Sequence, residues 1–183
     1  MGLPVSVDWP WNHPVRWSDA ASAGVSIRMN ADEMARASIA GGLDVEGIES
    51  LVADLTIVPW LDGLEVRGVL QARVIRTCGV SLEPFEEMVD EPVVLRFVPG
   101  GSPNAAPPTE GDVELDLEAE DPPDCVAGDA VDLGSCLSEQ LALALSPFPR
   151  RPGVEFQPPE MSGSLSPFAA LARLKFASPE DGE

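Results

Sequence analysis

The sequence predicts an α+β fold: a mostly antiparallel sheet around a long central hairpin, an N-terminal helix pair, one helix after a VDLG strand, and a C-terminal helix. Three observations lead to this class. Apolar and polar residues alternate over 63–78 and again over the returning segment 82–98, as in strands. Helical spacing with capping signals occurs on both sides of this hairpin. Nineteen prolines and 16 glycines among 183 residues require long loops elsewhere.

The bulk composition fits a single domain over residues 1–176, with a flexible loop at about 99–111 and a disordered tail over 177–183. Cys78, Cys125 and Cys136 are too irregularly spaced for a disulfide framework, so we expect a reducing, cytoplasmic location. The opening lacks the basic start and apolar run of a signal peptide. No stretch approaches the roughly 18 apolar residues of a membrane span, so we expect no membrane association.

The first segment, up to Trp17, contains three of the four tryptophans, Trp9, Trp11 and Trp17, and the only histidine, His13. Aromatic rings beside a basic residue such as Arg16 can stack on nucleic-acid bases. We favour a contribution to the core, because tryptophan buries a large apolar area. The apolar run 25–29 that follows is typical of a short strand.

Two helices are predicted next, over 31–43 and 45–55. Asn30 is placed to cap the first, with Glu33 completing a capping box and Met34 and Ile39 on its apolar side. The second has apolar residues at helical spacing. These are Ile48, Leu51, Val52 and Leu55.

The central hairpin gives the clearest strand pattern. Residues 78–81 form its turn, and Pro84 and Pro92 indicate bulges or an edge position on the returning strand. One face of the first strand is apolar and small, and the other is polar. The first face has Val66, Gly68, Leu70, Ala72 and Val74, and the second has Arg67, Gln71 and Arg73.

The region from residue 97 to residue 149 contains no lysine, arginine or histidine, and much of the net charge of −20 lies there. Its segment 112–118 alternates strictly and would place four carboxylates on one strand face. A basic segment lying along them would relieve their mutual repulsion. A solvated face whose charges discourage edge pairing is the open alternative. The four residues are Asp112, Glu114, Asp116 and Glu118.

Two further helices are predicted towards the C-terminus. A short strand within 129–135 leads into a helix capped by Ser135 and ended by Pro147. Its apolar stripe comprises Leu137, Leu141, Ala144 and Leu145. The second begins at Ser166 and Pro167. Its candidate contact residues are Phe168, Leu171, Leu174 and Lys175.

Between these helices, a Pro-rich corner holds two adjacent arginines. The corner comprises Pro149, Arg150, Arg151, Pro152 and Gly153. The arginines could pair with carboxylates of this chain or cover the preceding helix C-terminus. They could also clamp a phosphate of RNA, or contact carboxylates of a protein partner.

Sequence motifs for catalysis are lacking, and we expect no enzyme, catalytic residue, metal or cofactor. His13 has no nucleophile motif nearby, and the chain has no phosphate-binding glycine loop and no nucleophile elbow. The many carboxylates leave a hydrolase or nuclease with a divalent ion as a distant alternative.

Several segments together resemble the YceD family, the large ribosomal RNA subunit accumulation proteins, in its alphaproteobacterial form. The resemblance covers about residues 14–176 in the family's order. It rests above all on VDLG followed by EQLALAL and PFPRRPG, and on SPFAALARLK near the C-terminus. Many relatives have C-x-x-C where this chain has Cys78-Gly79-Val80-Ser81, so a metal site implied for them does not carry over. Cys78 is then expected to be a packing residue or a relic.

The resemblance implies a non-enzymatic factor needed for 23S ribosomal RNA to accumulate. Combined with the acidic composition, it suggests an adaptor whose acidic face binds a basic large-subunit ribosomal protein. The arginine corner and the C-terminal helix would then fix the complex on precursor 23S rRNA or another factor. The alternative is direct, structure-specific recognition of rRNA through Arg150 and Arg151. A strongly negative surface disfavours sequence-independent binding to phosphates.

Overall fold

The computed structural model describes residues 11–21, 24–105 and 121–156. These residues form a five-stranded sheet in the order β2-β3-β4-β5-β6 and a separate antiparallel pair, β1 with β7. The first four strands of the large sheet are antiparallel neighbours, whereas β6 runs parallel to β5. The elements are β1 (Pro14–Arg16), a 3-10 turn η1 (Trp17–Ala21), β2 (Val25–Asn30), α1 (Glu33–Gly42), β3 (Gly47–Trp60), β4 (Gly63–Thr77), β5 (Pro84–Pro99), β6 (Asp124–Val126), β7 (Ala130–Asp132) and α2 (Leu133–Ala144).

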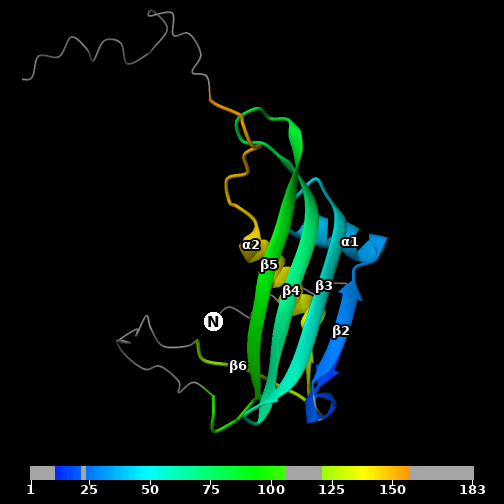
Figure 1. The fold of residues 1–183 in the computed structure, drawn as a ribbon, viewed down its shortest axis with the longest axis vertical. Helices are drawn as coiled ribbons and strands as arrows, with labels where there is room; N and C mark the ends of the chain where they lie inside the picture. Colours follow the sequence, from blue (N-terminus) through cyan, green and yellow to red (C-terminus); the bar gives the residue numbers. More distant parts are fainter. Residues whose placement is uncertain (1–10, 22–23, 106–120, 157–183) are drawn as a thin grey trace, which may run out of the picture.

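The large sheet and the helices form two layers. Figure 1 shows the sheet in front with α1 and α2 behind it, so the other face of the sheet carries no helix among the described residues. The predicted α+β class, with a mostly antiparallel sheet and a long central hairpin, is confirmed. No helix in the described part of the chain is long and apolar enough to cross a membrane.

The predicted N-terminal helix pair is wrong, because the segment given to its second helix lies in β3. A β-bulge between Ile48 and Ser50 explains the error. The extra residue puts Ile48 and Leu51, three apart in sequence, on the same buried face, which imitates helical spacing. Beyond the bulge the buried residues follow the strand period of two. They are Leu51, Ala53, Leu55 and Ile57.

Both observed helices begin at an aspartate rather than at the predicted cap. Asp32, not Asn30, caps α1, and its carboxylate accepts the Ala35 N–H at 2.8 Å. Asp132, not Ser135, caps α2, so this helix starts earlier than expected. In each case the strand runs up to the helix, and the aspartate is the last residue with extended backbone angles. Met34, expected on the apolar side of α1, is exposed.

The central hairpin agrees closely with the sequence pattern. β4 pairs with β5 without interruption from Leu64 to Thr77, and Val66, Leu70, Ala72 and Val74 are buried as predicted. The returning strand β5 pairs with β6 only at residues 97–99. Pro92 therefore occupies an edge position, where its missing N–H leaves no gap in the ladder to β4.

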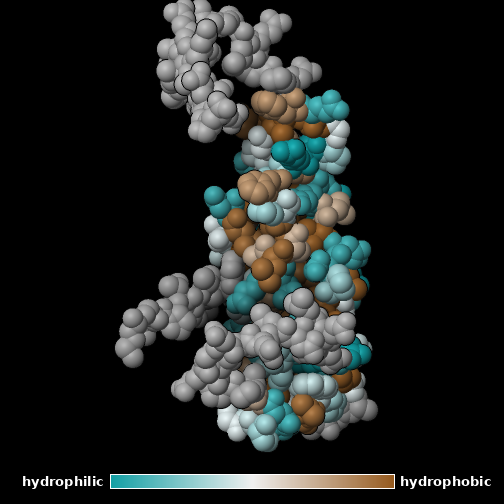
Figure 2. All heavy atoms as spheres, turned by 90° about the vertical axis from the view of Figure 1, so that its left-hand side faces the viewer, coloured by the Kyte–Doolittle hydropathy of each residue, from teal (hydrophilic) through white to brown (hydrophobic). Residues whose placement is uncertain are grey.

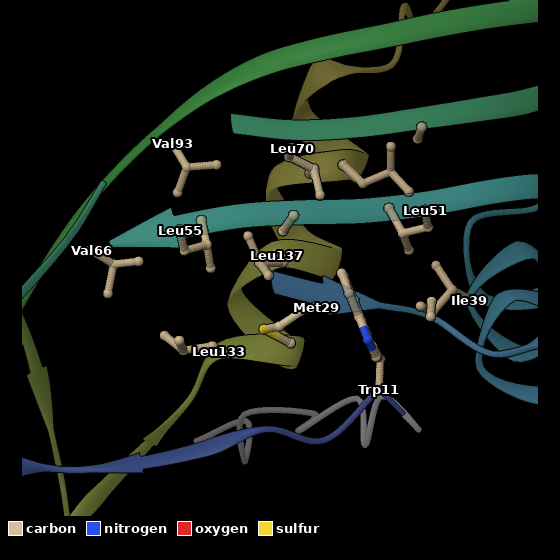
Figure 3. Packing of buried hydrophobic residues seen from close by; sticks show 14 of the residues in the cluster. Trp11, Met29, Ile39, Leu51, Leu55, Val66, Leu70, Val93, Leu133 and Leu137 are labelled. Carbon is tan, nitrogen blue, oxygen red and sulfur yellow. The ribbon is translucent and has the colours of Figure 1, made fainter. Parts of the chain in front are cut away.

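The core lies between the sheet and the helices, and the N-terminal segment closes one side of it. Figure 3 shows Trp11 pointing between the sheet and α2, near Leu51 and Leu137. Trp11 is buried, which confirms the core interpretation for this residue, and Trp17 packs partly buried against the same cluster. Trp9 lies outside the described residues.

Candidate functional site

The arginine corner, residues 149–153, packs on the turn of the central hairpin, residues 78–83. Gly79 donates its N–H to the Pro149 carbonyl at 2.9 Å, and Arg151 donates its N–H to the Cys78 sulfur at 3.4 Å. Figure 1 shows the chain after α2 running up to the hairpin end of the sheet. The prolines hold this segment extended, so it reaches the turn instead of continuing the helix. The corner is thus anchored through its backbone.

Cys78 lies at the centre of this contact and is fully buried. Its sulfur accepts the N–H groups of Ser81 at 3.5 Å and of Arg151 at 3.4 Å. These hydrogen bonds, that of Ser81 foremost, lower the pKa of the Cys78 thiol to about 6. Its position agrees with the expected packing role. By contrast, burial and the nearby carboxylate of Glu139 raise the pKa of Cys136 to about 12.

The two arginines of the corner differ in their surroundings. The Arg151 guanidinium pairs with the Glu83 carboxylate of the hairpin turn at 3.0 Å, and both side chains are about half exposed. Such a pair contributes about 0 to 1 kcal/mol. Arg150 is exposed and forms no ion pair within the described part of the chain. It is the arginine that a partner could reach without first breaking a contact.

Two large apolar side chains are exposed at this end of the molecule, one in the hairpin turn and one directly before the corner. Leu82, in the hairpin turn, is 77% exposed and has a φ of 58°, a left-handed backbone that disfavours side chains larger than glycine or asparagine. Phe148, directly before the corner, is 79% exposed. The end of the molecule where turn and corner meet therefore presents both apolar groups and a cation.

The other two predicted sites fall on segments without a described structure. The acidic face (Asp112, Glu114, Asp116 and Glu118) and the C-terminal helix contacts (Phe168, Leu171, Leu174 and Lys175) lie outside the described residues. Of the three predicted sites, the structure therefore describes only the arginine corner, which packs on the hairpin turn.

Sequence reasoning missed an ionic cluster on the helix-free face of the sheet. Glu65 of β4 is buried and accepts hydrogen bonds from Arg67 at 3.0 Å and from Arg96 at 2.8 Å. The Arg96 guanidinium also lies over the Trp60 ring, 5.1 Å from its centroid. Burial would raise the pKa of Glu65, but the hydrogen bonds from the two arginines outweigh burial and lower it. The hairpin register, which puts Glu65 opposite Arg96, is the signal that could have revealed the pair.

The ionisable side chains of the described residues do not gather into a metal site. No three His, Cys, Asp or Glu side chains among them are grouped to hold a metal ion. The backbone N–H of His13 is bonded to the Asp132 carboxylate at 2.7 Å, which joins the N-terminal segment to the start of α2. The carboxylates of the described part mostly face arginines or solvent.

A comparison of the sequence with models of known protein families identifies the relatives of this chain. Residues 66–175, more than half of the chain, match the model of the family described as large ribosomal RNA subunit accumulation protein YceD. The chain belongs to the YceD family. The match includes β4, β5, α2 and the arginine corner, and membership implies a role in the accumulation of large-subunit ribosomal RNA. Searches of curated proteins and of solved structures gave no significant match.

Proposed function

We propose that this protein is a non-enzymatic, cytoplasmic factor of large ribosomal subunit biogenesis that acts as an acidic adaptor for a basic large-subunit ribosomal protein. The observation that carries the proposal is the combination of family membership with a charge of −20. Ribosomal components that assemble on RNA need strong positive charge, and an acidic partner complements that charge before assembly.

Carboxylates of the described residues support this proposal at the exposed side of β5. Asp90 is exposed and Glu91 half-buried, and neither forms an ion pair within the described part of the chain. Asp121 and Asp124, which precede and begin β6, add two exposed carboxylates on the same side of the sheet. The proposed acidic face 112–118 directly precedes them in sequence. Unpaired carboxylates remain able to bind a cationic partner.

A second candidate is direct contact with precursor rRNA at the arginine corner. The observation that favours it is the exposure of both Arg150 and Phe148, because a guanidinium can bind a phosphate and an aromatic ring can stack on a base. Within the adaptor proposal, the same corner and the C-terminal helix 166–175 fix the complex on RNA or on another factor.

The two candidates separate in a pull-down from lysate with tagged protein. One sample is treated with ribonuclease, and a parallel sample uses the variant with Arg150→Ala and Arg151→Ala. The adaptor proposal predicts that a basic large-subunit protein stays bound after ribonuclease and to the arginine variant. Capture of ribosomal components only with intact RNA and intact arginines would reject the adaptor and favour the RNA clamp. Ribosomal RNA that is cleaved by the pure protein with Mg²⁺ would reject both.

A further inference from the structure

Among the described residues, most of the outer edge of β5 has no partner strand. β4 pairs with β5 over residues 84–97, but β6 covers the opposite edge only from Phe97 to Pro99. Between Pro84 and Arg96 no strand within the described ranges pairs with that edge. Figure 1 shows β5 as the left margin of the sheet above β6. Unpaired backbone groups of this kind are templates for an additional strand.

The register shows which residues of β5 direct their backbone groups to this edge. In a strand the N–H and C=O groups of alternate residues point to opposite neighbours. Gly100, just after β5, donates its N–H to Val126 of β6 at 2.8 Å, so even-numbered residues face away from β4. Pro84 and Pro92 have the same parity, and as prolines neither has an N–H to offer. Within the described ranges, the N–H and C=O groups of Glu86, Met88, Asp90 and Val94 therefore have no strand partner.

A hollow of about 540 Å³ adjoins the end of this edge, where β6 stops. The hollow is lined by Val94, Leu95 and Arg96 of β5, by Gln140 of α2, and by Asp121, Pro122 and Asp124 at and before β6. Figure 2 views the molecule from this side and shows hydrophilic and hydrophobic residues interspersed over its middle. A strand added above β6 would have room for its side chains here and would meet the carboxylates of Asp121 and Asp124, beside the Arg96 guanidinium that pairs with Glu65.

The charges along this edge indicate which kind of strand could bind there. Glu86 and Glu87 are paired with Arg73 and Arg76, but Asp90 and Glu91 have no such partner within the described part. A second copy of β5 at this edge would bring carboxylates against carboxylates, which opposes self-pairing. A strand with lysine or arginine at alternate positions would instead place its cations beside Glu86 and Asp90, whose side chains share the outer face of β5.

We propose that the β5 edge from Glu86 to Val94 binds an extended basic peptide segment of a protein partner as an added strand. This inference rests on the proposed adaptor function and specifies how the basic partner is held. The main-chain hydrogen bonds of the added strand supply affinity without a defined partner sequence, and the carboxylates supply the preference for cations.

Hydrogen exchange and a synthetic probe test this proposal on the full-length protein. The probe is an eight-residue peptide that alternates lysine and valine, and the control is the same peptide with its central backbone nitrogens methylated. In the free protein, the N–H groups of Glu86, Met88 and Asp90 should exchange fast and those of Glu87 and Val89 slowly. Binding of the probe should slow hydrogen exchange at the three fast N–H groups. The methylated control should bind at least about tenfold more weakly than the probe.

Two pairs of variants locate the interaction. Met88→Pro removes one edge N–H, so that position 88 would resemble Pro92. It should weaken binding of the probe at least about fivefold relative to Met88→Ala. The double variant with Asp90→Asn and Glu91→Gln should weaken binding of the probe by about threefold to tenfold at low salt. The charge-matched control is Glu33→Gln with Asp44→Asn, on α1 and the turn after it, and should leave binding unchanged.

The results that would reject strand addition differ from those that would reject the adaptor proposal. Equal binding of the probe and its methylated control would mean that charge alone holds the peptide, and the adaptor would survive without an added strand. Slow exchange of Glu86, Met88 and Asp90 in the free protein would mean that the edge is already occupied. Absence of probe binding at low salt would also reject strand addition. The adaptor itself fails only if the pull-down retains no basic ribosomal protein after ribonuclease.

Discussion

Among the glycines that the structure describes, Gly134 should be the least tolerant of replacement by alanine. Gly134, in the first turn of α2, lies against the N-terminal segment. A Cβ atom there would stand 1.2 Å from the Trp11 carbonyl oxygen and 2.4 Å from its carbon. Because the obstacle is backbone, no side-chain rotation relieves the overlap. The VDLG pattern thus ends in glycine so that the N-terminal segment can cross α2 closely.

The expected loss of stability follows from the displacement that the added methyl group imposes on the N-terminal segment. Restoring an ordinary contact requires the segment around Trp11 to shift by about 2 Å. Such a shift withdraws the Trp11 side chain, now only 7% exposed, from the core. Loss of a buried tryptophan costs about 3 to 5 kcal/mol, so we expect Gly134→Ala to lower the free energy of unfolding by that amount. The corresponding fall in Tm is about 6 to 20 °C for a chain of this size.

The control is Gly41→Ala in α1, where an added Cβ meets nothing within 4 Å. Alanine favours the helix there, so we expect a gain of about 0.5 to 1 kcal/mol. Urea unfolding followed by circular dichroism measures both variants, and tryptophan fluorescence should shift to longer wavelength only for Gly134→Ala. A Gly134→Ala protein within about 1 kcal/mol of wild type would refute the close approach.

Four further variants test the contacts described above. Glu65→Leu should lower the free energy of unfolding by about 3 kcal/mol in urea titrations, because it removes the buried carboxylate that accepts hydrogen bonds from both Arg67 and Arg96; a neutral result would contradict this. The hydrogen-bonded Cys78 thiolate should make wild-type stability rise between about pH 6 and pH 9 relative to Cys78→Ser, and this gain should be lost as the pH falls through 6. Parallel titrations of the two proteins measure that difference, and identical profiles would count against a lowered pKa. Arg151→Ala should cost at most about 1 kcal/mol and Arg150→Ala nothing measurable, as thermal unfolding would show; a larger loss for Arg150→Ala would mean that it is structural.

The sequence indicated the central hairpin well because local pattern and tertiary burial agree there. β4 alternates between buried and outward residues from Val66 to Val74, and the edge position of Pro92 follows from proline chemistry alone. β3 was misread because a bulge near Ile48 interrupts the period of two where the strand begins. Periodicity in a short window cannot distinguish a bulged strand from one helical turn.

The candidate site was predictable only in part. The proline-flanked arginines stand out in an acidic chain, but only tertiary structure shows that Arg151 turns to Glu83 while Arg150 stays exposed. The anchoring role of Cys78 was equally hidden, because its hydrogen bond from Arg151 joins residues 73 positions apart. The open edge of β5 depends on where β6 ends, which alternation alone does not reveal.

The β5 edge and the arginine corner make different contributions in the adaptor proposal. The edge binds the basic partner, whereas the corner is anchored to the hairpin turn through Cys78 and Gly79 and leaves Arg150 exposed. Because both features belong to the central hairpin and its immediate contacts, a bound partner and Arg150 would be held by one rigid element. This arrangement suits a factor that presents a ribosomal protein to RNA.

The most direct test is the ratio of large-subunit to small-subunit ribosomal RNA in cells that lack the gene and carry a complementing copy. The adaptor proposal predicts that wild type and the charge-matched control with Glu33→Gln and Asp44→Asn restore the ratio. The variant with Asp90→Asn and Glu91→Gln should restore it less, at equal protein level. Full restoration by that variant, together with failure of Arg150→Ala, would contradict the adaptor and place the function in the arginine corner.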